Sequence, residues 1–137
     1  MAEKIHLVEY YHATVHDKPG EAYQVLSEIS RSGVSLMAFN AVPAGPDRTQ
    51  LVLFPQNPEK LVRVAAKTGL VLSGPHQAFL IQGDDELGAL ANIHHRLFDA
   101  KVNVYASSGV SDGRGGFGYV VYIRTEDVDK AAQALGV

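Results

Sequence analysis

Residues 14–29 read TVHDKPGEAYQVLSEI and residues 82–97 read QGDDELGALANIHHRL, and this pair of stretches decides the fold. Each stretch passes from an acidic turn into a segment with helical spacing of apolar residues. At an offset of 68 residues Asp17 aligns with Asp85, and the alignment needs no gap over most of each half. The other identical pairs are Gly20 and Gly88, Val34 and Val102, Ala38 and Ala106, Val42 and Val110, Gly45 and Gly113, and Val52 and Val120. The hydrophobic pattern repeats as well, and such patterns specify secondary structure. The chain therefore contains two copies of one unit.

Both copies have elements in the same order. The expected strands are residues 5–15, 34–39, 51–54 and 70–72 in the first half, and 78–82, 102–106 and 119–123 in the second. Stripes at helical spacing are formed by Ala22, Val25, Leu26 and Ile29, by Leu61, Val64, Ala65 and Thr68, by Leu90, Ile93 and Leu97, and by Val128, Ala131, Ala132 and Leu135. The resulting order, βαββαβ, predicts an α+β fold of two ferredoxin-like units in tandem. Each unit is expected to be an antiparallel sheet with two helices on one face.

The expected units are residues 1–73 and 76–137, joined by the short linker Ser73-Gly74-Pro75. The second copy lacks a full fourth strand, because the counterpart of Leu70 is Val137 at the end of the sequence. In this topology the fourth strand flanks the first, so the strand at 78–82 is left as an edge. We expect that edge to be covered, either by the other repeat or by a second chain.

Four segments resemble the ACT domain: VHDKPGEA (15–22) followed by SGVSL (32–36), and QGDDELGAL (82–90) followed by AKVNV (100–104). The similarity covers nearly the whole chain, twice, and looks like the small stand-alone proteins made of two tandem ACT units. It implies a regulatory, non-catalytic protein that binds a small metabolite, commonly an amino acid, where two ACT units pack side by side. A homodimer and a regulated enzyme partner are the further expectations.

The resemblance also implies where the ligand binds. In the family the ligand sits against the loop between the first strand and the first helix, and a polar side chain at the start of the second strand often helps to hold it. Carried over by position, the loop residues are Asp17, Lys18, Pro19, Gly20 and Glu21 in the first unit, and Asp85, Glu86, Leu87, Gly88 and Ala89 in the second. The second-strand positions are Ser35 and Asn103. Leu87 replaces the usual Pro, and Ser35 stands where Asn is frequent, so one of the two sites can be degenerate.

The two loops suit a zwitterionic ligand on physical grounds. A helix N-terminus offers unpaired N–H groups and a partial positive charge to a carboxylate, while Gly20 or Gly88 permits close approach of the backbone. Asp17 or Asp85 can receive an ammonium group, and Asn103 can donate and accept hydrogen bonds. The two aspartates either cap the helices alone or cap them and contact a ligand, and the sequence leaves both possibilities open.

RNA binding is the alternative function. The stretch GRGGFGYVVY (113–122) follows most of the aromatic strand motif of RNA-recognition modules, with Phe117 and Tyr119 as stacking platforms. The net charge of −3 disfavours a nucleic-acid partner, because affinity depends on cations that neutralise phosphates. The same stretch has G-x-G-x-x-G spacing, but its glycines lead into a strand, whereas a dinucleotide loop opens a helix. We expect these glycines to form a hairpin connection.

Composition narrows the remaining classes. A chain of 137 residues with 46% hydrophobic and 20% charged residues is globular, and no apolar run approaches the roughly 20 residues that span a bilayer. We expect a cytoplasmic protein without a membrane partner. The absence of cysteine excludes disulfides and thiolate chemistry. His94 is expected on or beside a buried stripe and His95 in solvent, and no histidine has metal-binding spacing. No catalytic residue, metal or cofactor is expected. Four aromatics, Tyr10, Tyr11, Phe79 and Tyr105, are expected to pack a sheet against helices or a neighbouring sheet.

Overall fold

The computed structural model describes residues 3–84 and 87–137. Its strands hydrogen-bond in the order β2-β3-β1-β4-β6-β5. The strands are β1 (Lys4–His16), β2 (Leu36–Pro43), β3 (Arg48–Pro55), β4 (Ser73–Asp84), β5 (Val104–Ser111) and β6 (Gly116–Ile123). The helices are α1 (Glu21–Arg31), α2 (Pro58–Thr68), α3 (Ala89–Asp99), the 3-10 turn η1 (Thr125–Asp127) and α4 (Val128–Leu135). The chain divides into two compact units.

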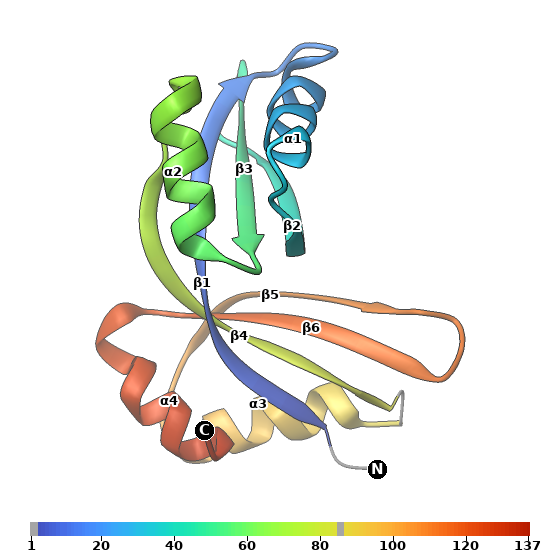
Figure 1. The fold of residues 1–137 in the computed structure, drawn as a ribbon. Coiled ribbons are helices and arrows are strands. Elements are labelled where there is room, and N and C mark those ends of the chain that lie inside the picture. The colour runs from blue at the N-terminus through green and yellow to red at the C-terminus, as the bar shows by residue number, and fades with distance from the viewer. Residues whose placement is uncertain (1–2, 85–86) are drawn as a thin grey trace. The chain divides into compact units, whose positions relative to one another are not determined.

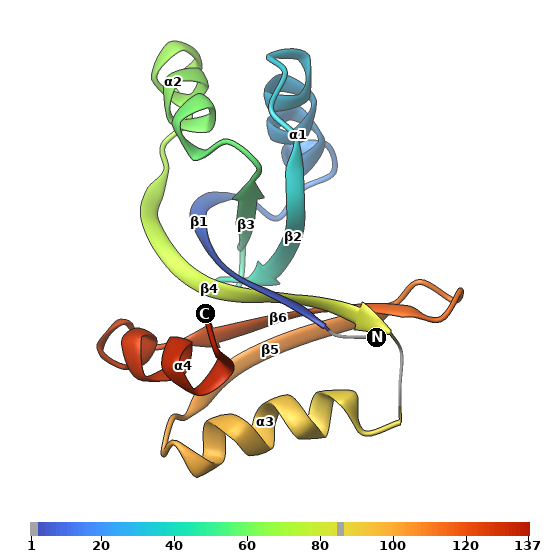
Figure 2. The same ribbon diagram turned by 60° about the horizontal axis from the view of Figure 1, so that its bottom comes forward.

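The first unit is Glu9–His76. Its strands follow the order β2-β3-β1-β4, and α1 and α2 cover one face of this sheet (Figures 1 and 2). The antiparallel register pairs Tyr11 of β1 with Leu53 of β3. Side chains alternate across a strand, so every second residue of β1 and β3 faces the helices. The core under the helices consists of Tyr11, Ala13, Ile29, Val34, Leu51, Leu53, Leu61 and Val64.

The second unit is Met1–Val8 together with Gln77–Val137. Here α3 and α4 cover one face of the sheet (Figure 2). The core under them consists of Phe79, Ile81, Ile93, Leu97, Val102, Phe117, Val121, Ile123, Val128, Ala131 and Leu135. Ile5, from the N-terminal part of β1, packs against this core. The N-terminal residues of the chain therefore belong to the unit formed by its C-terminal half.

This arrangement answers what covers the edge of the second unit. Strand β4 has β6 on one side and β1 on the other. Because residues 1–8 group with residues 77–137, the start of β1 takes the place of the fourth strand in the second unit. The prediction was that the other repeat or a second chain covers this edge, and the strand that covers it comes from the same chain. The α+β fold of βαββαβ units is confirmed.

Two local predictions are wrong. Residues 70–72 form no strand, and the presumed linker Ser73-Gly74-Pro75 is the beginning of β4. The sequence reads as a turn because Gly and Pro interrupt strands, but a proline without an N–H is tolerated at a sheet edge. Residues 73–76 lie at such an edge of the first unit, since β4 pairs with β6 only from Ala78 onward. One continuous strand thus ends the first repeat and begins the second.

Most of the apolar residues predicted to face the core from the helices are buried. Ile29, Leu61, Ile93 and Leu97 are fully buried, as their stripes predict. Leu90 departs from its stripe: it is 38% exposed because it lies in the first turn of α3, away from the centre of the core. His94 is half-buried and His95 is exposed, as expected. No helix within the described residues is long and apolar enough to cross a membrane.

Candidate functional site

The glycine before the helix has the same backbone geometry in both predicted loops. Gly20 precedes α1 with φ 91° and Gly88 precedes α3 with φ 83°, a left-handed conformation that favours glycine. Among residues 3–84 and 87–137, no side chain caps α1 or α3. The prediction that Asp17 caps α1 is wrong, because the glycine takes the N-cap position three residues later. Asp85 and Glu86 lie outside the described residues.

Open space adjoins both glycines. A Cβ atom added to Gly20 or Gly88 meets nothing within 4 Å. The first N–H groups of an α-helix have no partner inside the helix. Within the part of the chain that the structure describes, no capping side chain satisfies them, although the Glu21 N–H donates to the carbonyl of Lys18 over 3.3 Å. Each loop therefore presents an accessible helix N-terminus with a partial positive charge.

The loop of the first unit is held by backbone hydrogen bonds. The Asp17 N–H donates to the carbonyl of Asp47 over 2.9 Å, and the Lys18 N–H donates to the carbonyl of His16 over 2.9 Å. The Glu21 carboxylate accepts from the His16 N–H over 3.3 Å. Lys18, like Pro19, is exposed. The Glu21 carboxylate is thus drawn back toward the end of β1.

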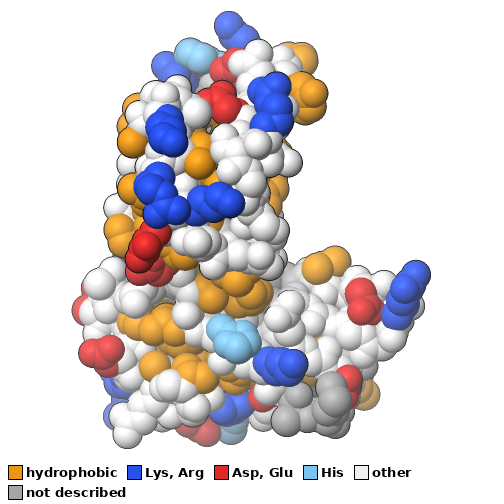
Figure 3. Space-filling view, viewed as in Figure 1, with side chains coloured by type: hydrophobic (Ala, Val, Ile, Leu, Met, Phe, Trp, Pro, Cys, Tyr) orange, Lys and Arg blue, Asp and Glu red, His pale blue; other side chains and the backbone are white. Residues whose placement is uncertain are grey.

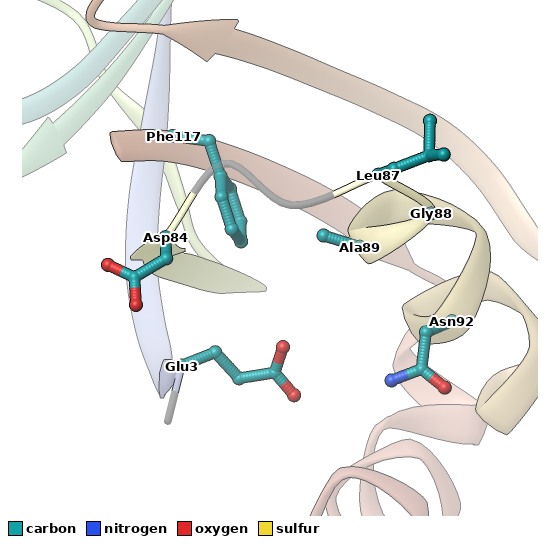
Figure 4. Close-up of a pocket in the computed structure, with 7 residues that line it drawn as sticks. All are labelled: Glu3, Asp84, Leu87, Gly88, Ala89, Asn92 and Phe117. Carbon is teal, nitrogen blue, oxygen red and sulfur yellow. The ribbon is translucent and has the colours of Figure 1, made fainter. Parts of the chain in front are cut away.

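The loop of the second unit borders a pocket of about 190 Å³. Its lining residues are Glu3, Asp84, Leu87, Gly88, Ala89, Asn92 and Phe117. In Figure 4 the Glu3 carboxylate reaches from β1 toward the first turn of α3, and the Phe117 ring lies between Asp84 and Ala89. Leu87 points away from the others. The pocket combines two carboxylates, an amide and an uncapped helix N-terminus.

Glu3 is fixed by an arginine on the neighbouring helix. Arg96 Nη1 donates to Glu3 Oε1 over 2.9 Å, and Arg96 Nη2 donates to the carbonyl of Leu135 over 3.0 Å. The exposed fractions of the two side chains are 32% for Arg96 and 26% for Glu3. The guanidinium therefore joins the start of β1, α3 and the end of α4.

Ser35 and Asn103 lie apart from the loops of their own units. Each is exposed and stands just before the second strand of its repeat, after the C-terminus of α1 or α3. The loops lie at the N-termini of the same helices, each of which has 11 residues. At 1.5 Å per residue the helix separates the two positions by about 16 Å. A small ligand contacts both kinds of residue only when they come from different units.

The first unit has its own pocket, of about 200 Å³. Glu21 is the one predicted ligand-binding residue in its lining. The other lining residues are Val15, Gln24, Val25, Glu28, Ile29, Thr68, Gly69 and Leu70. This pocket therefore lies between α1 and the end of α2, beside the predicted loop.

Histidines and aromatic rings gather on the first unit's sheet. The ring centroids of His12 and His76 are 4.7 Å apart, and Tyr10 lies 5.2 Å from His76 and 5.0 Å from Phe54. Burial, and then the neighbouring His76, lower the pKa of His12 below its usual 6.5. Burial, and then Glu9, raise the pKa of Tyr11. Within residues 3–84 and 87–137, no group of three or more His, Asp or Glu side chains is arranged to hold a metal ion.

The aromatic strand does not offer a platform for RNA. Phe117 is 7% exposed and belongs to the core beneath α3 and α4, and Tyr119 packs on that core. The two rings stack on each other with centroids 4.2 Å apart. In Figure 3 Lys and Arg side chains gather over α2, which carries three such residues. Near β6, Arg124 lies over the ring of Tyr105, 5.4 Å from its centroid. The alternative function is not supported.

Sequence reasoning missed four residues of the second unit's pocket: Glu3, Asp84, Asn92 and Phe117. Asp84 directly precedes the predicted loop, so its position in the sequence would have found it. Asn92 lies one turn after Gly88, so helical spacing alone would have found it. Phe117 follows from the strand pairing, since it lies opposite Gly83 at the end of β4. Glu3 carries no such signal, because its place depends on the N-terminal strand joining the second repeat.

Comparisons with known proteins agree with this fold. No protein-family model matches the chain, and no curated protein sequence matches it. Among solved structures, one protein from Bacteroides thetaiotaomicron superposes with a TM-score of 0.81 at 16% identity, covering 96% of this chain and 88% of its own. The regulatory subunit of aspartate kinase from Thermus thermophilus, in its ligand-free form, gives a TM-score of 0.63 at 16% identity, covering 99% and 96%. The Thermus flavus regulatory subunit gives 0.62 at 14% identity, covering 99% and 95%. The chain has an ACT-like fold.

Proposed function

We propose that this chain is a regulatory protein of tandem ACT units, without catalytic activity of its own, that binds a small amino-acid-type metabolite. One observation carries the proposal: the pocket at Gly88, where the carboxylates of Glu3 and Asp84 share a lining with the uncapped N-terminus of α3. The likeness of the fold to aspartate kinase regulatory subunits supports a regulatory role of this kind.

The two ends of the pocket suit the two ends of an amino acid. The N–H groups at the start of α3 favour an α-carboxylate, both by hydrogen bonding and by the helix dipole. The carboxylates of Glu3 and Asp84 favour an α-ammonium. Asn92 can donate or accept, so its amide can serve either group.

The size of the pocket limits the ligand. A volume of about 190 Å³ is below the roughly 300 to 1,000 Å³ of pockets that hold drug-sized ligands. Phe117 offers a ring to an apolar side chain. We therefore expect a small amino acid rather than a nucleotide.

The assembly is part of the proposal. In this proposal the ligand sits where ACT units of two copies of the chain meet, with Asn103 or Ser35 of one copy reaching a loop of the other. Gly20 repeats the backbone geometry of Gly88, which supports a second, weaker site at Asp17, Lys18, Pro19 and Glu21. A homodimer and a regulated enzyme follow as expectations, since a regulator needs a partner through which to act.

A thermal-shift screen against the individual proteinogenic amino acids tests the function. A ligand at 100 times its dissociation constant stabilises the folded state by about 2.7 kcal/mol. The substitutions Glu3→Gln and Asn92→Ala should each weaken the response. Gln133→Ala, at an exposed position of α4 that lines neither pocket, is the matched control. The proposal is wrong when no amino acid raises the melting temperature, or when the response is the same in all three variants.

A further inference from the structure

The pocket of the first unit has an acidic character that the proposed function does not use. Two carboxylates, Glu21 and Glu28, line it from α1. Glu28 forms no ion pair with any residue in the described ranges 3–84 and 87–137, and its side chain is half-buried. A half-buried carboxylate without a cation is stabilised when one binds.

The end of α2 adds to this negative potential. Thr68 is the last residue of α2, and Gly69 caps the helix in a left-handed conformation, with φ 80°. Both residues line the pocket. The last carbonyl groups of a helix have no partner inside it and carry the negative end of the helix dipole. The pocket therefore offers carbonyl oxygens as well as carboxylates.

The second unit shows what fills the equivalent position. The two repeats align at an offset of 68 along α1 and α3, which places Arg96 at the position of Glu28. The ends of α2 and α4 align at an offset of 67, which places Leu135 at the position of Thr68. Arg96 donates to the Leu135 carbonyl over 3.0 Å and to the Glu3 carboxylate over 2.9 Å. One repeat thus holds a guanidinium between a helix C-terminus and a carboxylate, and the other has the equivalent helix C-terminus with a glutamate in place of the arginine.

We propose that the first unit's pocket binds a small molecule carrying a guanidinium or ammonium group, which occupies the position that the Arg96 guanidinium takes in the second unit. Glu28 is the carboxylate that receives the cation, and Glu21, two turns earlier in α1, lines the same pocket. The carbonyl at the end of α2 accepts a further hydrogen bond.

The rest of the lining defines the ligand class. Val25 and Leu70 give the pocket apolar walls for a short alkyl chain. Its volume of about 200 Å³ is below the roughly 300 to 1,000 Å³ of pockets that hold drug-sized ligands, so it suits a small molecule. A guanidinium presents a planar fork of donors that matches a carboxylate and a carbonyl together, whereas an ammonium is a point charge. An alkylguanidinium is therefore the best match, with alkylammonium ions weaker.

Calorimetric titration with agmatine, arginine and citrulline tests the inference on the full chain. Citrulline is the neutral isostere of arginine, so it isolates the charge. Agmatine and arginine should bind the wild-type protein saturably, and citrulline should bind at least about tenfold more weakly, since hydrogen bonds to charged groups are the strong ones. Glu28→Gln should weaken agmatine binding by a similar factor. Glu126→Gln, on the exposed turn η1, is the charge-matched control and should leave the affinity unchanged.

A variant whose own side chain occupies the proposed cation position gives an independent test. Glu28→Arg reproduces the second repeat, so it should abolish agmatine binding and raise the melting temperature in the absence of any added cation. The inference is overturned when citrulline binds as well as arginine, when Glu28→Gln and Glu126→Gln behave alike, or when Glu28→Arg still binds agmatine. It does not rest on the proposed function: Glu3→Gln and Asn92→Ala, which test the other pocket, should leave agmatine binding intact.

Discussion

Replacing Arg96 with methionine tests whether the guanidinium holds the second unit together. Methionine keeps much of the apolar stem but removes both hydrogen bonds, to Glu3 and to the Leu135 carbonyl. The ion pair is about one-third exposed, so it contributes less than about 1 kcal/mol. The bond from a charged donor to the carbonyl adds about 1 to 2 kcal/mol. We expect a loss of about 2 kcal/mol.

This loss converts into a measurable change in melting temperature. With an unfolding entropy of about 2.1 cal/mol/K per residue over 137 residues, 2 kcal/mol lowers the melting temperature by about 7 °C when the chain unfolds as one. Differential scanning calorimetry measures the temperature and the enthalpy. A double-mutant cycle with Glu3→Gln should give a coupling energy of about 0.5 to 1 kcal/mol.

Arg63→Met is the control, because Arg63 is exposed on α2 and such a change costs less than about 0.5 kcal/mol. Equal melting temperatures for Arg96→Met and Arg63→Met would refute the assigned role. A zero coupling energy between Arg96 and Glu3 would leave the carbonyl bond as the whole effect.

Three further predictions concern single positions. Gly109→Ala places a Cβ against the Tyr119 ring, 2.6 Å from Cε1, and should lower the free energy of unfolding by about 1 to 3 kcal/mol in a denaturant titration. Gly118→Ala is the control, because its Cβ meets nothing within 4 Å and the loss should be smaller. Burial lowers the pKa of His12 below the unfolded value of 6.5, so the unfolded chain binds the proton first and stability falls as pH drops through 6.5. His12→Gln should flatten this dependence of stability on pH. An unchanged dependence in the variant would mean that another group causes it. The backbone N–H groups of Arg114 and Gly116 donate to the Asp112 carboxylate and lower its pKa below 3.8. These two amides should therefore be protected from hydrogen exchange above pH 3.8, and Asp112→Ala should remove that protection.

The fold is predictable from the sequence because its repeat and its patterning agree. Helical spacing located Ile29 and Leu97, and both are fully buried. The strand ends were less predictable. Gly74 and Pro75 look like a linker in sequence, and only the pairing of β4 shows that they begin a strand. The residues around Gly74 and Pro75 do not show whether another strand pairs with them, so the start of β4 could not be predicted from them.

The residues of the candidate sites also differ in how far the sequence predicts them. Gly88 and its neighbours were found from a short motif at a helix start, where the chemistry depends on adjacent residues. Glu3 and Glu28 were not found, because their environments depend on residues far away in the sequence. Arg96 in one repeat and Glu28 in the other differ by one residue type at one aligned position, and only the packing at the ends of α4 and α2 shows what that difference does.

The N-terminal strand of the second unit has a consequence for synthesis on the ribosome. Residues 4–8 emerge first, yet the strands and helices they pack against come from residues 77–137. At about 5 to 20 residues per second, the intervening 68 residues take about 3 to 14 seconds to follow. During that interval the strand has no native neighbour in its own unit, and Ile5 is open to any other apolar surface. Cutting the gene between the repeats would leave the C-terminal fragment with an open edge, and a synthetic peptide of the first residues should restore its folding.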